Sequence, residues 1–311
     1  MTKEILILDG GMSREIVRLG GQLRQPEWSA LALMETPDIV RQVHAEFVAA
    51  GADIITTNSY ALVPFHIGEA RFRKDGLNLA RLSGRLAREA ADACTERKVQ
   101  VAGCLPPIFG SYEPQRFDPS RVQDYLSVLV EGLDASVDIW LGETLSLIAE
   151  AQAVIDATAK TQKPVWISFT LEDSGAAIAS GRARLRSGET IAAAAEWALA
   201  SGVAALLFNC SQPEVMRAAV AEASAAARRA NTPMLVGVYA NAFEPRPDTV
   251  RANEVLRGVN SRLTPQLYAR FASQWVEAGA AIVGGCCGIG VSHIHHLAAT
   301  LKHGRPAATR R

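Results

Sequence analysis

The 311-residue chain lacks any long, uninterrupted apolar run. Its first residues, MTKEILILDG, contain no extended apolar signal segment and lead directly into a strand-like pattern. The most apolar stretch, residues 190–208, is interrupted by Glu196 and Gly202, so it reads as a helix, a turn and a strand. We therefore expect no membrane partner.

The chain also lacks net charge and a dense set of cysteines. Its 32 basic and 32 acidic residues balance, which gives no indication of binding to nucleic acid or to an anionic membrane surface. Five cysteines without an even, loop-rich framework are typical of a reducing compartment. We predict a cytoplasmic protein that acts on small molecules, as a monomer or a small homo-oligomer.

Short β-rich runs alternate with helical patterns along the chain. Several helices end at a glycine that is followed by a strand, as in AAGADII and VEAGAAIV, which is the expected helix-to-strand turn. No linker rich in proline and glycine divides the chain. Strands are predicted to begin near residues 5, 53, 99, 138, 164, 205, 233 and 280, and helices to cover 39–50, 77–94, 122–136, 147–158, 190–200, 213–230, 265–278 and 292–301.

Eight strands alternating with helices predict one closed (β/α)8 TIM barrel. We expect it to span residues 1–303, with Ser292 capping the last helix and a short C-terminal tail at 304–311. A doubly wound open sheet is the alternative. It is disfavoured because DGGMSREI, after the first strand, is not the G-x-G-x-x-G phosphate loop.

The residues that carry out chemistry in a TIM barrel lie where the strands end. Four of the five cysteines occupy such positions, while Cys94 falls in a predicted helix. In VGGCCGIG, Cys286 and Cys287 would point to opposite faces of a regular strand, but the flanking glycines permit the strand to break. Both thiols can then reach the rim on which Cys210 lies. The other polar residues at strand ends are Asp9, Thr57, Asn58, Cys104, Glu143 and Tyr239.

Three cysteines on one rim indicate a soft-metal site, and zinc is the metal best suited to it. Three protein ligands would leave a fourth position for a substrate. The alternative from the residues alone is that the cysteines are small core residues. The string CCGIGVSHIHH suggests a histidine ligand, but His293, His295 and His296 lack the four-residue spacing of a zinc-binding helix. We expect these histidines to be solvated.

Six stretches of the chain carry a family resemblance: LDGGMSREI, IVRQVHAEFVAAGADIITTNSY, GETLSLIAEAQ, WISFTL, LLFNCSQPE and IVGGCCGIGVSHI. They resemble the homocysteine S-methyltransferase family over nearly the whole chain. The resemblance implies a TIM-barrel enzyme in which Cys210, Cys286 and Cys287 hold zinc and the sulfur of homocysteine takes the open position, forming methionine. It also implies that Asp9 and Glu143 hold the homocysteine ammonium.

The chemistry of homocysteine suits these residue types. Its thiol has a pKa above neutrality, and zinc stabilises the thiolate. Backbone N–H groups around Gly10, Gly11 and Met12 can receive its carboxylate. From the residues alone, Asp9 could equally cap a turn and Glu143 could pair with a helix N-terminus. Weaker candidates on the same rim are Asn58 and Asn209.

We expect in-line methyl transfer from an onium donor, which needs no catalytic side chain beyond the bound substrate thiolate. Thr144 follows Glu143, where betaine-using members resemble one another in having tyrosine, and the chain also lacks their C-terminal extension. S-methylmethionine or another sulfonium is therefore expected rather than betaine. The loop 104–117 departs from the usual family pattern, as does VYANAFEP at the seventh strand. Aromatic residues of this loop that could face a cationic donor are Phe109, Tyr112 and Phe117.

Two other classes of function stay open on the sequence. A non-catalytic zinc- or thiol-binding barrel would bind metal without turning over any donor. A barrel enzyme with a different substrate would use the cysteines as core residues and bind no stoichiometric metal. A phosphate-binding version of that enzyme would need a glycine-rich loop after the seventh strand, and ANAFEPRPD is not one.

Overall fold

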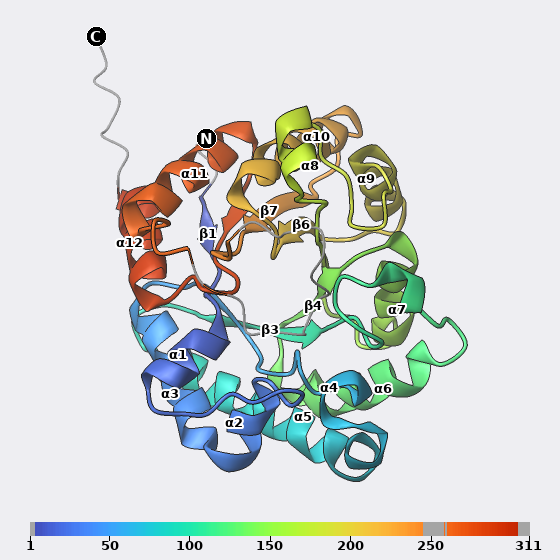
Figure 1. Cartoon of the computed structure of the whole chain (residues 1–311), viewed down its shortest axis with the longest axis vertical. Coiled ribbons are helices and arrows are strands. Elements are labelled where there is room, and N and C mark those ends of the chain that lie inside the picture. Colours follow the sequence, from blue (N-terminus) through green and yellow to red (C-terminus); the bar gives the residue numbers. More distant parts are fainter. Residues whose placement is uncertain (1–3, 245–257, 259, 304–311) are drawn as a thin grey trace.

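The computed structural model describes residues 4–244, 258 and 260–303. Eight parallel strands form a ring at the centre of the molecule, with helices around it (Figure 1). The strands are β1 (Leu6–Ile7), β2 (Ile54–Thr56), β3 (Gln100–Leu105), β4 (Ile139–Leu145), β5 (Val165–Phe169), β6 (Ala205–Asn209), β7 (Leu235–Tyr239) and β8 (Ile282–Val283). Each lies where the sequence predicted a strand.

The sheet runs in the order β1-β8-β7-β6-β5-β4-β3-β2. A parallel bridge between Leu8 and Ile54 joins its two ends, and the Asp9 N–H donates to the Ile54 carbonyl at 3.0 Å. The predicted (β/α)8 barrel is therefore confirmed, and the open doubly wound sheet is excluded.

The predicted helices are also present, with shifted bounds. α12 begins at Val291, so Ser292 lies inside its first turn, and the prediction that Ser292 caps this helix is wrong. The Val291 N–H instead lies 3.4 Å from a carboxylate oxygen of Glu15. The helices are α1 (Met12–Arg18), α2 (Ala30–Glu35), α3 (Pro37–Ala49), α4 (Pro64–Ile67), α5 (Glu69–Asp92), α6 (Val122–Leu133), α7 (Ile148–Thr158), α8 (Gly175–Ser180), α9 (Ile191–Ala200), α10 (Pro213–Arg229), α11 (Pro265–Ala278) and α12 (Val291–His303), with 3-10 turns η1 (Pro114–Arg116) and η2 (Asp134–Ser136).

Side chains inside the barrel alternate along each strand with side chains that face the helices. In β4, Ile139 and Leu141 belong to the interior cluster, whereas Trp140 packs in the layer between sheet and helices. Because side chains on a strand alternate with a period of two, Glu143 continues the inner face at the carboxyl end of β4. Asn209 takes the same place in β6. Strand periodicity thus delivers polar groups to the mouth of the barrel.

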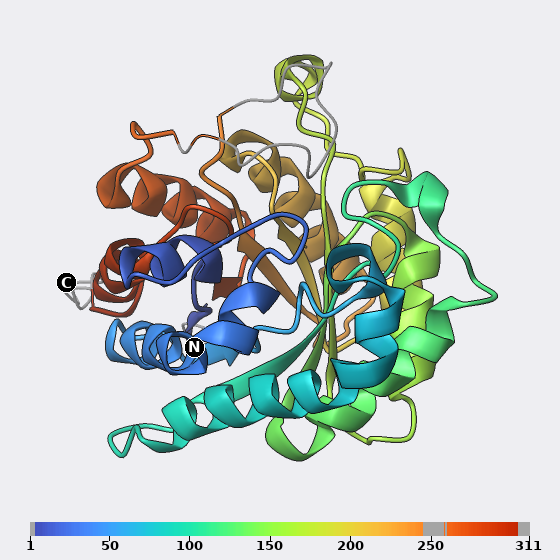
Figure 2. The ribbon, with the colours of Figure 1, turned by 60° about the horizontal axis from the view of Figure 1, so that its bottom comes forward.

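α8 stands beyond the ring of helices, at the end of the barrel toward which β5 runs (Figure 2). The candidate site lies at this end. None of the helices in the described ranges combines the length and apolar character that crossing a membrane requires. The predicted tail at 304–311 and the end of ANAFEPRPD lie outside the described residues.

Candidate metal centre and substrate pocket

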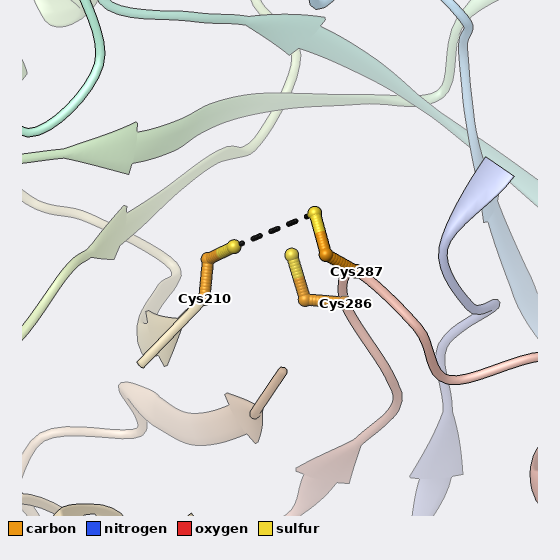
Figure 3. Close-up of side chains that lie close together, drawn as sticks. All are labelled: Cys210, Cys286 and Cys287. Carbon is orange, nitrogen blue, oxygen red and sulfur yellow. Dashed lines mark hydrogen bonds between the residues drawn. The ribbon is translucent and has the colours of Figure 1, made fainter. Parts of the chain in front are cut away.

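The three predicted metal ligands meet at the carboxyl end of the barrel. Cys210 follows β6 directly, and Cys286 and Cys287 lie just beyond β8. Their sulfur atoms point toward one another (Figure 3), and all three lie within 4.8 Å of each other. The Cys210 and Cys287 sulfurs are 3.7 Å apart. Two thiolates on one tetrahedral zinc, each about 2.3 Å from the metal, are separated by about 3.8 Å, so the spacing suits zinc.

Local backbone constraints produce this convergence. Cys210 has φ +48°, a left-handed conformation that few residues other than glycine adopt. Its N–H donates to the Tyr239 carbonyl at 3.1 Å. At Gly285, a Cβ would lie 2.2 Å from Cγ2 of Ile289, so no side chain fits there. The Gly285 N–H donates to the Asp9 carbonyl at 2.9 Å, which fixes the start of the cysteine pair beside β1.

The three thiols are not equivalent in charge. Hydrogen bonds from Cys286 and Cys287 hold the pKa of Cys210 well below its usual value. Hydrogen bonding to Cys210 raises the pKa of Cys286 and Cys287 well above theirs, and burial adds to the increase. The charged form is therefore more favourable at Cys210 than at Cys286 or Cys287. A soft divalent cation would compensate three thiolates at once, so the donor set fits zinc.

His293 contacts the backbone instead of the sulfurs. Its Nε2 lies 2.9 Å from the Leu263 carbonyl, and its Nδ1 lies 3.4 Å from the Gly290 nitrogen. The prediction that this histidine is solvated is wrong, because the segment that carries Leu263 partly buries it. Within the described part of the chain, the group of potential ligands close enough to share a metal consists of the three cysteines.

A cavity of about 150 Å³ opens onto the sulfur cluster. Its walls include the three cysteines, Glu143 and Asn58. Sequence reasoning missed most of its aromatic wall, which comes from loops after the strands. Among the missed residues, Tyr60 had a local signal, since it follows the strand-end residues Thr57 and Asn58. The aromatic residues that line the cavity are Trp28, Tyr60, Tyr112 and Phe243.

The three aromatic residues predicted to face a donor do not all lie at the cavity. Tyr112 lines the cavity, as expected. Phe109 and Phe117 instead pack against the hydrophobic core between sheet and helices, so the expectation that they face a donor is wrong. Apolar rings without a polar atom gain more from burial there than from a wet rim.

Two buried carboxyl groups lie close to each other near the cavity. Glu143 accepts a hydrogen bond from the Cys104 thiol at 3.1 Å, and burial raises its pKa to about 7. Asp9 accepts the Thr56 N–H at 2.7 Å and the Thr56 hydroxyl at 3.2 Å. Burial raises the pKa of Asp9 to about 8, and the neighbouring Glu143 adds to the increase. No basic side chain of the described residues is paired with either group. Asp9 thus bonds across to β2 rather than capping a turn.

The two asparagines differ in position. Asn58 lines the cavity and donates through Nδ2 to the Ser29 carbonyl at 3.1 Å. Asn209 is fully buried, with its Oδ1 accepting from the Ser168 hydroxyl at 2.8 Å and its Nδ2 donating to the Thr144 hydroxyl at 2.8 Å. Asn209 therefore ties neighbouring strand ends together beneath the cavity.

The residues predicted to offer backbone N–H groups to a carboxylate, Gly10, Gly11 and Met12, have different surroundings. The Gly11 N–H already donates to the Ile289 carbonyl at 2.8 Å, so it is not available to a substrate in this structure. Gly10 packs against the same carbonyl, where a Cβ would lie 2.3 Å from the oxygen. Met12 lines the cavity and is the first residue of α1.

A family model described as homocysteine S-methyltransferase matches residues 6–301. The chain belongs to this family. The homocysteine S-methyltransferase of Escherichia coli (strain K12) is 32% identical over 92% of this chain and 91% of its own length. A selenocysteine methyltransferase of Astragalus bisulcatus is 28% identical, with 90% and 88% covered. The crystal structure of the homocysteine methyltransferase MmuM from Escherichia coli, in its metallated form, gives a TM-score of 0.76 at 27% identity and covers 96% of both chains.

Family membership confirms the resemblance inferred from the motifs. Like its relatives among the homocysteine S-methyltransferases, the chain is a methyltransferase, and the methyl acceptor is homocysteine. The two other classes considered from the sequence, a non-catalytic barrel and an enzyme with an unrelated substrate, are therefore set aside.

Proposed function

We propose that this methyltransferase holds zinc through Cys210, Cys286 and Cys287, and that a sulfonium compound such as S-methylmethionine methylates homocysteine to methionine. The observation that carries the metal assignment is the meeting of three sulfurs within 4.8 Å beside the cavity. The metallated form of the related Escherichia coli enzyme supports it. When bound, zinc would supply the charge that keeps the homocysteine sulfur deprotonated near neutral pH.

Glu143 and Asp9 hold the homocysteine ammonium in this proposal. Burial makes their ionisation unfavourable in the empty protein, as their raised pKa values show. An ammonium group supplies the missing positive charge and forms charge-assisted hydrogen bonds with both carboxylates. The Met12 N–H receives the substrate carboxylate, because N–H groups in the first turn of a helix lack partners within that helix.

The cavity walls support a cationic donor. Trp28, Tyr60 and Tyr112 line the same cavity as the cysteines, and aromatic rings attract onium groups. A sulfonium leaves as a neutral thioether, whereas betaine must expel an amine from a stronger carbon–nitrogen bond. Thr144, in place of the tyrosine of betaine-using members, supports the same choice.

The methyl transfer is balanced without a proton moving in the same step. The homocysteine thiol first releases its proton to solvent. Its sulfur then forms a bond to the methyl carbon while the donor's carbon–sulfur bond breaks, and the electron pair stays on the departing thioether. The protein's contribution is to hold the two substrates in line.

A donor comparison tests this function. Zinc-loaded protein with homocysteine is supplied with S-methylmethionine, S-adenosylmethionine or betaine at matched concentrations, and methionine formation is measured. We expect at least one sulfonium to outperform betaine. Faster turnover with betaine than with every sulfonium would overturn the donor assignment and leave the metal assignment standing.

A further inference from the structure

Tyr112 contacts the sulfur cluster directly. Its hydroxyl donates a hydrogen bond to Cys210 Sγ at 2.9 Å, although 98 positions separate the two residues in sequence. A hydrogen bond from a phenol to a thiolate is charge-assisted, and such bonds are roughly twice as strong as those between neutral groups. The contact therefore ties the loop after β3 to a proposed metal ligand.

The backbone around Tyr112 is held in an uncommon conformation. Tyr112 has φ +64°, which a residue with a side chain adopts only where its surroundings impose it. Ser111 is buried, and its hydroxyl lies 2.6 Å from that of Tyr60. Gly110 has φ +140°, a conformation that residues with a side chain rarely adopt. Three consecutive residues thus hold the loop in the conformation that places the Tyr112 hydroxyl beside Cys210.

The buried ion pair between Arg186 and Asp173 contacts both the ring of Tyr112 and the segment that follows Cys210. The Arg186 guanidinium carbon lies 5.2 Å from the ring centroid. Arg186 pairs with Asp173 at 2.9 Å, and their side chains are only 11% and 7% exposed. Asp173 also accepts the N–H of Gln212 at 3.2 Å. The ion pair therefore holds the phenol and the cysteine at a set separation.

We propose that Tyr112 is a positioning residue for the metal ligand Cys210. Its hydrogen bond orients the Cys210 sulfur and withdraws part of the negative charge from it. The inference rests on the proposed zinc site. Removing the outer hydrogen-bonding partner of a ligand weakens metal binding by about 10- to 100-fold. The bond also lowers the energy of the sulfur electrons, which changes the light absorption of a metal–thiolate bond.

Zinc affinity provides the first test. Tyr112→Phe keeps the ring and its contact with Arg186 but removes the hydroxyl. In the full-length protein, competition with a chelator should show zinc bound about 10-fold more weakly or worse. Tyr125→Phe is the matched control, because its buried hydroxyl donates to Glu69 at 3.0 Å and meets no cysteine. Equal zinc affinity in Tyr112→Phe and wild type would overturn the inference.

Cobalt(II) provides a spectroscopic test that a merely structural role would not affect. The sulfur-to-cobalt charge-transfer band should move to longer wavelength in Tyr112→Phe and stay in place in Tyr125→Phe. An unshifted band in Tyr112→Phe would overturn the inference while leaving the metal site intact. A wild-type protein that takes up neither zinc nor cobalt would instead remove the metal site, and the inference with it.

Discussion

Each of the three cysteines can be replaced by serine with little change in volume, which makes metal content a direct measure of its role. Cys210→Ser, Cys286→Ser and Cys287→Ser should each lower zinc from about one per chain to a small fraction, because two thiolates hold zinc far less well than three. Cys94→Ser is the control, since Cys94 lies outside the cluster. The measurement is the amount of zinc per chain in each purified, reduced protein. A variant that keeps its full zinc would exclude that cysteine from the ligand set.

The proposed contact between Glu143 and the homocysteine ammonium can be tested by changing either the side chain or the substrate. Glu143→Gln should raise the homocysteine KM by about 10- to 100-fold, because the loss of a charged hydrogen bond costs about 1.5–3 kcal/mol. 4-Mercaptobutanoate is homocysteine without the amino group, so it cannot contact Glu143 through an ammonium. Its methylation should be slow, and equally slow in the wild type and in Glu143→Gln. Steady-state rates with both thiols decide the matter. An unchanged homocysteine KM argues against contact between Glu143 and the ammonium.

Residue types at strand ends could be read from the sequence, whereas their hydrogen-bond partners could not. Alternation along β4 places Glu143 on the inner face, so its position follows from the strand alone. The Gly11 N–H is occupied by Ile289, 278 positions away, and no local pattern reports such a contact. Trp28 reaches the cavity from a loop whose path depends on packing with the rest of the fold.

Among the structural elements, the turn after β8 has little tolerance for added atoms. Gly285→Ala places a methyl group against the branched, buried Cβ of Ile289, which cannot rotate away. We expect the free energy of unfolding to fall by about 1–3 kcal/mol and zinc affinity to fall with it. Gly175→Ala is the control, because a Cβ there meets no atom within 4 Å. Denaturant unfolding and zinc titration measure the two effects. Wild-type behaviour in Gly285→Ala would show that the turn can relax.

All eight strands could be predicted because apolar β-rich runs recur between helical patterns, and eight such alternations match the TIM barrel. Several short helices were missed. α1, α4 and α8 have seven, four and six residues, too few to show a helical period. The start of α12 was misplaced by the serine signal, because Glu15, distant in sequence, meets the first N–H of that helix.

For the molecule as a whole, the buried acids link stability to pH. In the protein without metal or substrate, Asp9 has a pKa of about 8, against 3.8 for the exposed group. Between these values the folded state holds a proton that the unfolded state has lost, so stability decreases as pH rises toward 8. Relative to Asp9→Asn, the wild type should lose roughly 1–3 kcal/mol between pH 6 and pH 8. Unfolding of both proteins by urea at the two pH values measures this difference. Parallel pH profiles would show that Asp9 is ionised throughout.

The sulfur cluster lies beside the place where the first and last strands of the chain pair. Cys286 and Cys287 follow β8, which pairs with β1 on one side and with β7 on the other, while Cys210 follows β6. During synthesis, the growing polypeptide therefore carries a solitary thiol from this trio until its last strand emerges. Under the proposed zinc assignment, all three ligands can hold one metal in this arrangement only after residue 287 has been made and β8 lies between β7 and β1.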